Sequence, residues 1–277
     1  MGLFDAFKKK QCDICGGDIG LLGNRKLEDG NMCKNCAKKL SPFFDDRRHS
    51  TIAQINEQLA YREQNRAALP DFHCTRVMGP GYNKIYLDED AGTFMIASDA
   101  SMASWEKEQE ANPDIIRFDQ VTGCRIDIDE NHNEVTRTDK DGNKVSYNPP
   151  RYRYYYDFDV IINVRHPWFD EIKLRLNKSS VDIEYTEHAG STARIGGLTI
   201  GLGGGSSFNP MDYPEYRNYM EMCEEIKEVL LGVRQQARDS AAAAAAPKMA
   251  VTCPWCGATT TPNASGQCEF CGGAVNG

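Results

Sequence analysis

The chain has 277 residues, a formal net charge of −8 and a sequence pI near 5.2. This length accommodates one medium domain with small modules, and the acidic balance argues against a protein that coats nucleic acid. No stretch of about 18 residues is continuously apolar, which excludes a membrane-spanning helix. The first ten residues lack a signal peptide's apolar core. Paired Cys-x-x-Cys motifs without a secretion signal indicate a reducing compartment. We therefore expect a cytoplasmic protein.

The N-terminal end is short, apolar on one side and basic. Leu3, Phe4 and Phe7 share one side of a helical turn and precede Lys8 to Lys10. Such an end can contact an anionic membrane surface. Because it is barely two turns long, a frayed terminus or a cap on the following module is the interpretation we favour.

Residues 1–48 contain the first cysteine cluster, formed by Cys12, Cys15, Cys33 and Cys36. Each Cys-x-x-Cys turn points two sulfurs at one place, and two turns complete a tetrahedron around Zn²⁺. A segment this short cannot bury enough apolar surface to fold alone, so the metal must supply a folding free energy of about 10–16 kcal/mol. A redox or disulfide pair is the alternative.

The order of local signals around these cysteines is a turn, a hairpin and a helix. Asp29-Gly30 predicts a hairpin turn, and residues 33–40 favour a helix that carries the second pair in its first turn. This is the order found in a treble-clef zinc finger. The stretch also resembles an uncharacterised bacterial domain of unknown function, and that resemblance implies zinc but no activity. It rests on Cys12-x-x-Cys15-Gly16, Ile19-Gly20-Leu21-Leu22-Gly23, Lys26-Leu27, Asp29-Gly30 and Cys33-x-x-Cys36.

The loop between the two pairs has the length seen in GATA-type DNA-binding fingers. Residues 1–48 also carry ten Lys or Arg against seven Asp or Glu. A dense basic tail follows those fingers, however, whereas residues 41–49 mix both signs. A structural or protein-binding finger is therefore favoured, and a nucleic-acid-associated regulator stays as the alternative.

Residues 49–70 predict a connector helix. Thr51 and Gln54 form a capping box, and Pro70 ends the helix. The side chains that share one face are Ile52, Ile55, Leu59, Arg62 and Arg66. This face packs on the neighbouring domain or on a partner helix, and we favour the neighbouring domain.

Residues 71–238 predict an antiparallel β-domain that ends in a helix. Apolar residues alternate with polar ones, most clearly from Tyr152 to Val164. Turn signals stand at residues 130–133, 139–143 and 177–180. An amphipathic helix begins near Asp212 to Glu215. About seven strands closed by one helix resemble a pleckstrin-homology-like (PH-like) domain, and other small barrels or sandwiches are the rivals. The predicted fold class is α+β.

No catalytic constellation is recognisable in this β-domain. Asp127-x-Asp129-x-Asn131 lacks the glycine and the final glutamate of a calcium loop. The glycine-rich segment 186–211 lacks the helix and the Lys-Ser/Thr pair of a phosphate loop, so we expect a mobile loop. The five histidines are scattered, and Cys124 and Cys223 read as core thiols. An enzyme with its site in the β-domain is the less favoured alternative.

Residues 239–250 form an alanine-rich linker, and residues 251–277 form a second cysteine module. The alanine run either extends the preceding helix or stays a loose tether. The module holds two similar Cys-x-x-Cys-Gly turns and is similar to the short zinc ribbons at the ends of many bacterial proteins. Its expected zinc ligands are Cys253, Cys256, Cys268 and Cys271. Trp255 and Phe270 lie inside the two turns and offer an apolar contact to a protein.

Taken together, these signals predict a non-catalytic protein with two structural Zn²⁺ ions, built as a zinc module, a helix, a PH-like β-domain and a zinc ribbon in series. We expect it to act as a protein-interaction or scaffold module that binds a protein partner rather than nucleic acid.

Overall fold

The computed structural model describes residues 10–187, 191–195, 198–202, 208–245, 250–263 and 265–275. The apolar and basic end predicted for residues 1–9 and parts of the glycine-rich segment lie outside these residues. The chain divides into two compact units, residues 1–234 and residues 235–277. No helix among the described residues has the length and apolar character needed to cross a membrane.

The first unit begins with the four-cysteine module. Strands β1 (Lys10–Gln11) and β2 (Asp18–Ile19) pair antiparallel, as do β3 (Asn24–Lys26) and β4 (Asn31–Cys33), and helix α1 (Lys34–Ala37) follows. A short 3-10 helix (Asp46–His49) leads out of the module. Gly30 closes the β3–β4 hairpin, where a Cβ would lie 2.7 Å from Ile52 Cδ1. A glycine here therefore permits the close approach of the next helix.

Helix α2 (Ile52–Ala68) is the predicted connector, and its capping box between Thr51 and Gln54 is present. Two different cores bury α2 and the turn that follows it. Ile55 packs with Leu27, Met32 and Leu40 of the four-cysteine module. Beyond the other end of the helix, Leu69 in a 3-10 turn (Leu69–Asp71) packs with Tyr86 and Met95 of the β-domain. The connector therefore packs within its own chain, as favoured above.

Between these two cores lies a set of buried polar side chains, which we call the polar joint: Ser41, Arg62, Asn65, Asn112 and Asp114. Asp114 accepts hydrogen bonds from Arg62 Nη1 (2.5 Å) and Ser41 Oγ (2.8 Å). Asn65 Nδ2 donates to Asn112 Oδ1 (2.7 Å), and Asn112 Nδ2 donates to the carbonyl of Arg62 (2.8 Å). Every one of these contacts joins segments far apart in sequence, so the joint fixes α2 against the β-domain.

The first sheet has the strand order β5-β6-β7-β8 and is antiparallel throughout. Its strands are β5 (Arg76–Met78), β6 (Asn83–Asp88), β7 (Thr93–Ser98) and β8 (Ile116–Arg117). Helix α3 (Trp105–Ala111) stands between β7 and β8 and was not predicted. Asn112 ends α3 in the left-handed conformation, with φ +47°. This conformation turns the chain so that residues 112–115 reach the polar joint.

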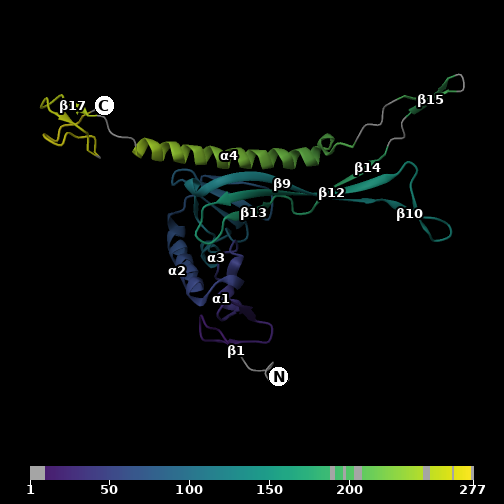
Figure 1. Cartoon of the computed structure of the whole chain (residues 1–277), viewed down its shortest axis with the longest axis horizontal. Coiled ribbons are helices and arrows are strands. Elements are labelled where there is room, and N and C mark those ends of the chain that lie inside the picture. The colour runs from purple at the N-terminus through teal and green to yellow at the C-terminus, as the bar shows by residue number, and fades with distance from the viewer. Residues whose placement is uncertain are drawn as a thin grey trace. The chain divides into compact units, whose positions relative to one another are not determined.

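The second sheet is built around the long strand β12 (Arg151–Val164) (Figure 1). On one side β12 pairs with β9 (Val121–Glu134) along almost its whole length. On the other side β14 (Val181–Thr186) pairs with its first half and β13 (Glu171–Arg175) with its second half. A 3-10 turn (Phe118–Gln120) precedes β9. The turn predicted at residues 130–133 is wrong, because these residues continue β9 opposite residues 153–156.

Two further hairpins leave the second sheet. Strands β10 (Thr136–Thr138) and β11 (Lys144–Ser146) enclose the predicted turn at residues 139–143. Strands β15 (Ser191–Ile195) and β16 (Leu198–Leu202) pair inside the segment expected to be a loop. The glycine-rich segment therefore contains a hairpin.

Helix α4 (Pro214–Ala245) follows a 3-10 turn (Pro210–Asp212), and its part within the first unit lies along the second sheet (Figure 1). The Tyr216 ring contacts Tyr156 and Phe158 of β12, with centroids 4.8 and 5.0 Å apart. Cys223, Ile226 and Leu230 continue the buried face. The helix runs to Ala245, so much of the alanine run extends it rather than forming a loose tether.

The observed architecture is a mixed α/β fold with antiparallel sheets. Among the described residues the strands form two four-stranded sheets and several hairpins, and no closed barrel. The PH-like domain therefore stays a prediction. The second unit contains β17 (Val251–Thr252) and β18 (Thr259–Thr260), and its small core consists of Cys253, Cys268 and Val275 with Val251 beside them.

Candidate metal centres

The first half of the N-terminal centre is a tight turn after β1. The amide of Gly16 donates to the carbonyl of Cys12 (2.7 Å), and the amide of Cys12 donates to the carbonyl of Gly17 (2.8 Å). Gly16 adopts φ +72°, which a residue with a side chain rarely adopts. The turn thereby brings Cys12 and Cys15 to one place.

The second half is the junction of β4 and α1. Cys33 caps α1, and Cys36 lies in its first turn, where its amide donates to Cys33 Sγ (3.4 Å). The amide of Cys33 donates to Cys12 Sγ (3.2 Å), and Cys15 Sγ lies 3.8 Å from Cys33 Sγ. All four sulfurs lie within 4.8 Å of one another. The structure thus gathers the four side chains predicted from sequence.

Two of these thiols have pKa values shifted in opposite directions. Burial raises the pKa of Cys12, but hydrogen bonds from the backbone amides of Cys33, Cys15 and Ile14 outweigh it and bring the pKa down to about 6. Burial, and then the three neighbouring sulfurs, raise the pKa of Cys36 far above its ordinary value. One thiolate therefore forms readily while a second is opposed by its neighbours, and a bound cation removes that conflict by favouring all four thiolates.

The C-terminal centre repeats one turn twice. The amides of Gly257 and Gly272 donate to the carbonyls of Cys253 and Cys268, each at 2.9 Å. Gly257 and Gly272 adopt φ +72° and +69°. Sulfurs of the two turns lie next to each other: Cys253 Sγ is 3.6 Å from Cys271 Sγ, and Cys256 Sγ is 3.8 Å from Cys268 Sγ. These four sulfurs also lie within 4.8 Å of one another.

The same division of acidity holds in this second centre. Burial raises the pKa of Cys268, but the backbone amides of Cys271 and Phe270 outweigh it and lower the pKa to about 6. A hydrogen bond from the backbone of Gly273 lowers the pKa of Cys271, but the sulfurs of Cys256 and Cys253 raise it to about 12. Burial raises the pKa of Cys253 as well, but the backbone amides of Cys256 and Trp255 outweigh it. Both centres therefore combine acidic thiols in a backbone cradle with one thiol that needs a cation to ionise.

Both groups are positioned to bind a metal ion, and their donor set defines what such an ion would do. Four sulfur ligands complete a tetrahedral shell, whereas catalytic metal sites keep a position open for water or substrate. The arrangement therefore fits a closed, structural metal site at each end of the chain.

The remaining cysteines do not join either centre, and the described residues hold no third group of metal-ligating side chains. Burial raises the pKa of Cys124 to about 11 and that of Cys223 to about 12, as expected of core thiols. Asp127 and Asp129 lie on β9 and face the charged residues of neighbouring strands rather than forming a loop.

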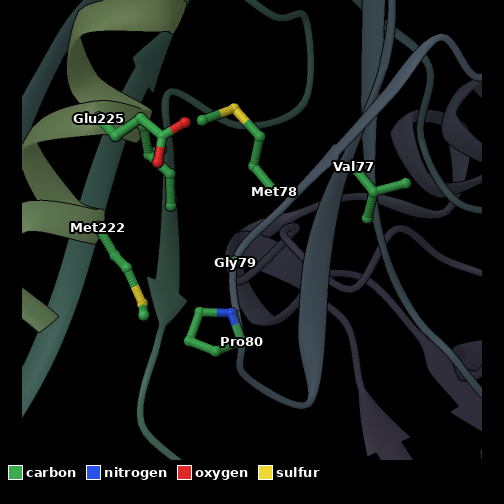
Figure 2. A pocket seen from close by; sticks show the side chains of 7 residues that line it. Val77, Met78, Gly79, Pro80, Met222 and Glu225 are labelled. Atoms are coloured by element: carbon green, nitrogen blue, oxygen red, sulfur yellow. The ribbon is translucent and has the colours of Figure 1, made fainter. Parts of the chain in front are cut away.

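A small apolar hollow lies between β5 and α4 (Figure 2). Figure 2 shows Met222 and Glu225 on the helix facing Met78 and Pro80 across the hollow. Arg76 Nη2 bonds Glu225 at 2.8 Å at the same junction. The hollow carries no nucleophile or metal-ligand group apart from this paired carboxylate.

Comparison with known proteins identifies only the first module. A family model described as "Domain of unknown function (DUF4428)" matches residues 10–58, which span the N-terminal centre and the start of α2. This confirms the resemblance predicted from the cysteine spacing and the glycines around it. No curated protein and no solved structure matches the chain.

Proposed function

We propose that each four-cysteine group binds one structural Zn²⁺ ion. The observation that carries this proposal is the convergence of four sulfurs within 4.8 Å at both ends of the chain. Zn²⁺ accepts a tetrahedral thiolate shell without a redox change, and soft sulfur ligands select it over Mg²⁺ or Ca²⁺. The turn, hairpin and helix around the first centre support a treble-clef arrangement, and the paired turns of the second support a zinc ribbon.

Native mass spectrometry of the whole chain tests the metal proposal. We expect a mass increase of two Zn²⁺ ions that a chelator removes, and a Cys12→Ser, Cys256→Ser double variant should lose both. Cys74→Ser is the matched control, because Cys74 lies in neither centre. A wild-type chain that purifies under reducing conditions without metal and keeps both modules folded would contradict the proposal.

We further propose that the protein is non-catalytic and binds a protein partner through its C-terminal module. Trp255 and Phe270 occupy equivalent places in the two turns and are 74% and 71% exposed. Trp255 is nevertheless fixed, since its Nε1 donates to the carbonyl of Ala274 (3.1 Å). Its ring also packs closely on Gly273, where an added Cβ would lie 2.6 Å from Trp255 Cδ1. Large, fixed, exposed aromatic side chains are the usual anchors of protein interfaces.

The buried titratable groups of the first unit support a non-catalytic role. Asp159 is held by Arg175 Nε (2.6 Å) and Lys173 Nζ (2.9 Å), although it is almost fully buried. His166 Nε2 is paired with Tyr61 Oη (2.8 Å). Together with the Arg62–Asp114 pair, these contacts are of the kind that structural ion-pair networks make.

Site-specific photo-crosslinking in the native host tests the binding role. A photoreactive amino acid at position 270 should yield a discrete protein adduct, and Trp255→Ala should abolish that adduct. Tyr82→Ala is the control, because Tyr82 is similarly exposed at 70% but lies in the first unit. Equal loss with both variants, or no adduct at all, would refute the proposed interface.

A further inference from the structure

A polar hollow of about 690 Å³ lies where the end of α1, the middle of α2 and the end of α3 meet. It lies in the first unit, beside the N-terminal metal centre. The side chains that matter for its chemistry are Lys38, Lys39, Arg62, Arg66, Gln109 and Asn112.

Positive charge exceeds negative charge in this hollow. The charge of Arg62 is matched by Asp114, and Arg66 Nη1 pairs with Glu63 (3.1 Å). Lys38 and Lys39 are exposed and form no ion pair within the described ranges. Glu110 is the single acid in the lining. In a chain with a net charge of −8, this hollow is therefore a local place of attraction for anions.

The hollow also has hydrogen-bond donors that no acceptor of the described residues uses. Arg66 Nε donates to the carbonyl of Gln109 (3.2 Å), which fixes the guanidinium, while its Nη2 has no partner among the described residues. Gln109 Nε2 is buried and has no hydrogen-bond partner. A buried N–H group without an acceptor is unfavourable, so a ligand oxygen placed there would be stabilised.

We propose that this hollow binds the phosphate group of a small phosphorylated molecule. Two unpaired lysines match a dianion. Arg66 Nη2 donates to one phosphate oxygen, and a rotation of the Gln109 side chain into the hollow brings its unpartnered Nε2 to another. The hollow holds several N–H donors and only one carboxylate. This composition argues against a cation as the ligand. Its volume exceeds that of a lone phosphate ion, so the remainder of the molecule lies in the same hollow.

Calorimetric titration of the metal-loaded full chain tests this site. The probes are inorganic phosphate, pyrophosphate and adenosine monophosphate, each at constant ionic strength. We expect binding that a Lys38→Met, Lys39→Met double variant weakens at least about tenfold. A Lys140→Met, Lys144→Met variant makes the same change of net charge on the exposed β10–β11 hairpin and should leave the dissociation constant within about twofold.

Gln109→Glu provides a second variant that leaves the lysines beside Cys36 intact. It replaces the unpartnered donor with a carboxylate and should abolish binding of all three probes. Absence of binding in the wild-type chain, or equal weakening by the two lysine pairs, would overturn the proposal. Duplex DNA that binds more tightly than every small probe and loses affinity in the Lys38, Lys39 variant would also overturn it in favour of a nucleic-acid surface.

Discussion

Replacing Arg62 with Met tests whether this arginine compensates the buried charge of Asp114. The Arg62 side chain is 4% exposed and its partner Asp114 is fully buried. The change leaves the Asp114 carboxylate with the Ser41 hydroxyl but no cation, and it removes donors to the carbonyls of Lys39 and Asn112. Loss of one member of a buried ion pair costs about 3–5 kcal/mol. We expect the free energy of unfolding to fall by this amount, out of a typical total of about 5–15 kcal/mol.

Urea unfolding of the metal-loaded chain, followed by tryptophan fluorescence, measures this change. Arg66→Met is the matched control, because Arg66 lies one turn further along α2 and also donates to a carbonyl at the end of α3. Its side chain is 35% exposed, so its ion pair with Glu63 is screened by solvent and contributes at most about 1 kcal/mol. Both variants remove one positive charge, so a larger loss of unfolding free energy in the Arg62 variant is due to burial of its ion pair.

A double-mutant cycle isolates the pair itself. Asp114→Asn removes the carboxylate charge, so adding it to Arg62→Met should recover part of the lost free energy, with a coupling of about 0.5–3 kcal/mol. The reasoning is refuted if Arg62→Met destabilises no more than Arg66→Met, or if the two changes at positions 62 and 114 are additive.

Three further predictions follow from the structure. Gly81→Ala places a Cβ 2.6 Å from the carbonyl oxygen of Arg175 and should destabilise the protein by about 1–3 kcal/mol. Gly232→Ala in α4 meets no atom within 4 Å and should stabilise the protein by about 0.5–1 kcal/mol. The thermal midpoints of the two variants should therefore move in opposite directions. Burial, and then Arg62, lower the pKa of His166 to about 4 from the ordinary 6.5. The contribution of His166 to stability is therefore full above pH 6.5 and is lost as the pH falls towards 4. His166→Gln should flatten the dependence of the free energy of unfolding on pH in this range, and an unchanged slope would argue against this role of His166. Cys12→Ser should raise hydrogen exchange in α2, whose Ile55 shares a core with Cys12, while Cys256→Ser should raise exchange in residues 250–275 alone.

The metal centres could be predicted from sequence because their geometry is local. Two cysteines on one tight turn are separated by two residues, and in three of the four pairs a glycine that permits the turn follows the second cysteine. The capping box that starts α2 is equally local, since Thr51 and Gln54 contact each other within one turn. Features of this kind need no knowledge of the rest of the fold.

The polar joint could not be predicted, because its hydrogen bonds join residues that are 47 to 73 positions apart in the sequence. Arg62 stood out only as a member of one helix face, and nothing near Asp114 indicated that its carboxylate would be buried against it. Helix α3 was missed because it is a single short element with no buried residue and hence no apolar periodicity. The polar stretch at residues 130–133 has the composition of a turn, but pairing with β12 outweighs that local preference.

The position of the joint explains why α2 carries polar residues on its buried face. Ile55 belongs to the core of the four-cysteine module and Leu69 to that of the β-domain, and Arg62 and Asn65 lie between them. An apolar contact there would tolerate sliding, whereas hydrogen bonds to Asn112 and Asp114 impose one register. We infer that the joint provides this specificity at the expense of stability. An Arg62→Leu, Asp114→Leu variant should then unfold at a urea concentration close to that of the wild type but show broadened or doubled amide NMR signals for residues 39–41 and 112–115. Sharp single signals in that variant would show that packing alone sets the register.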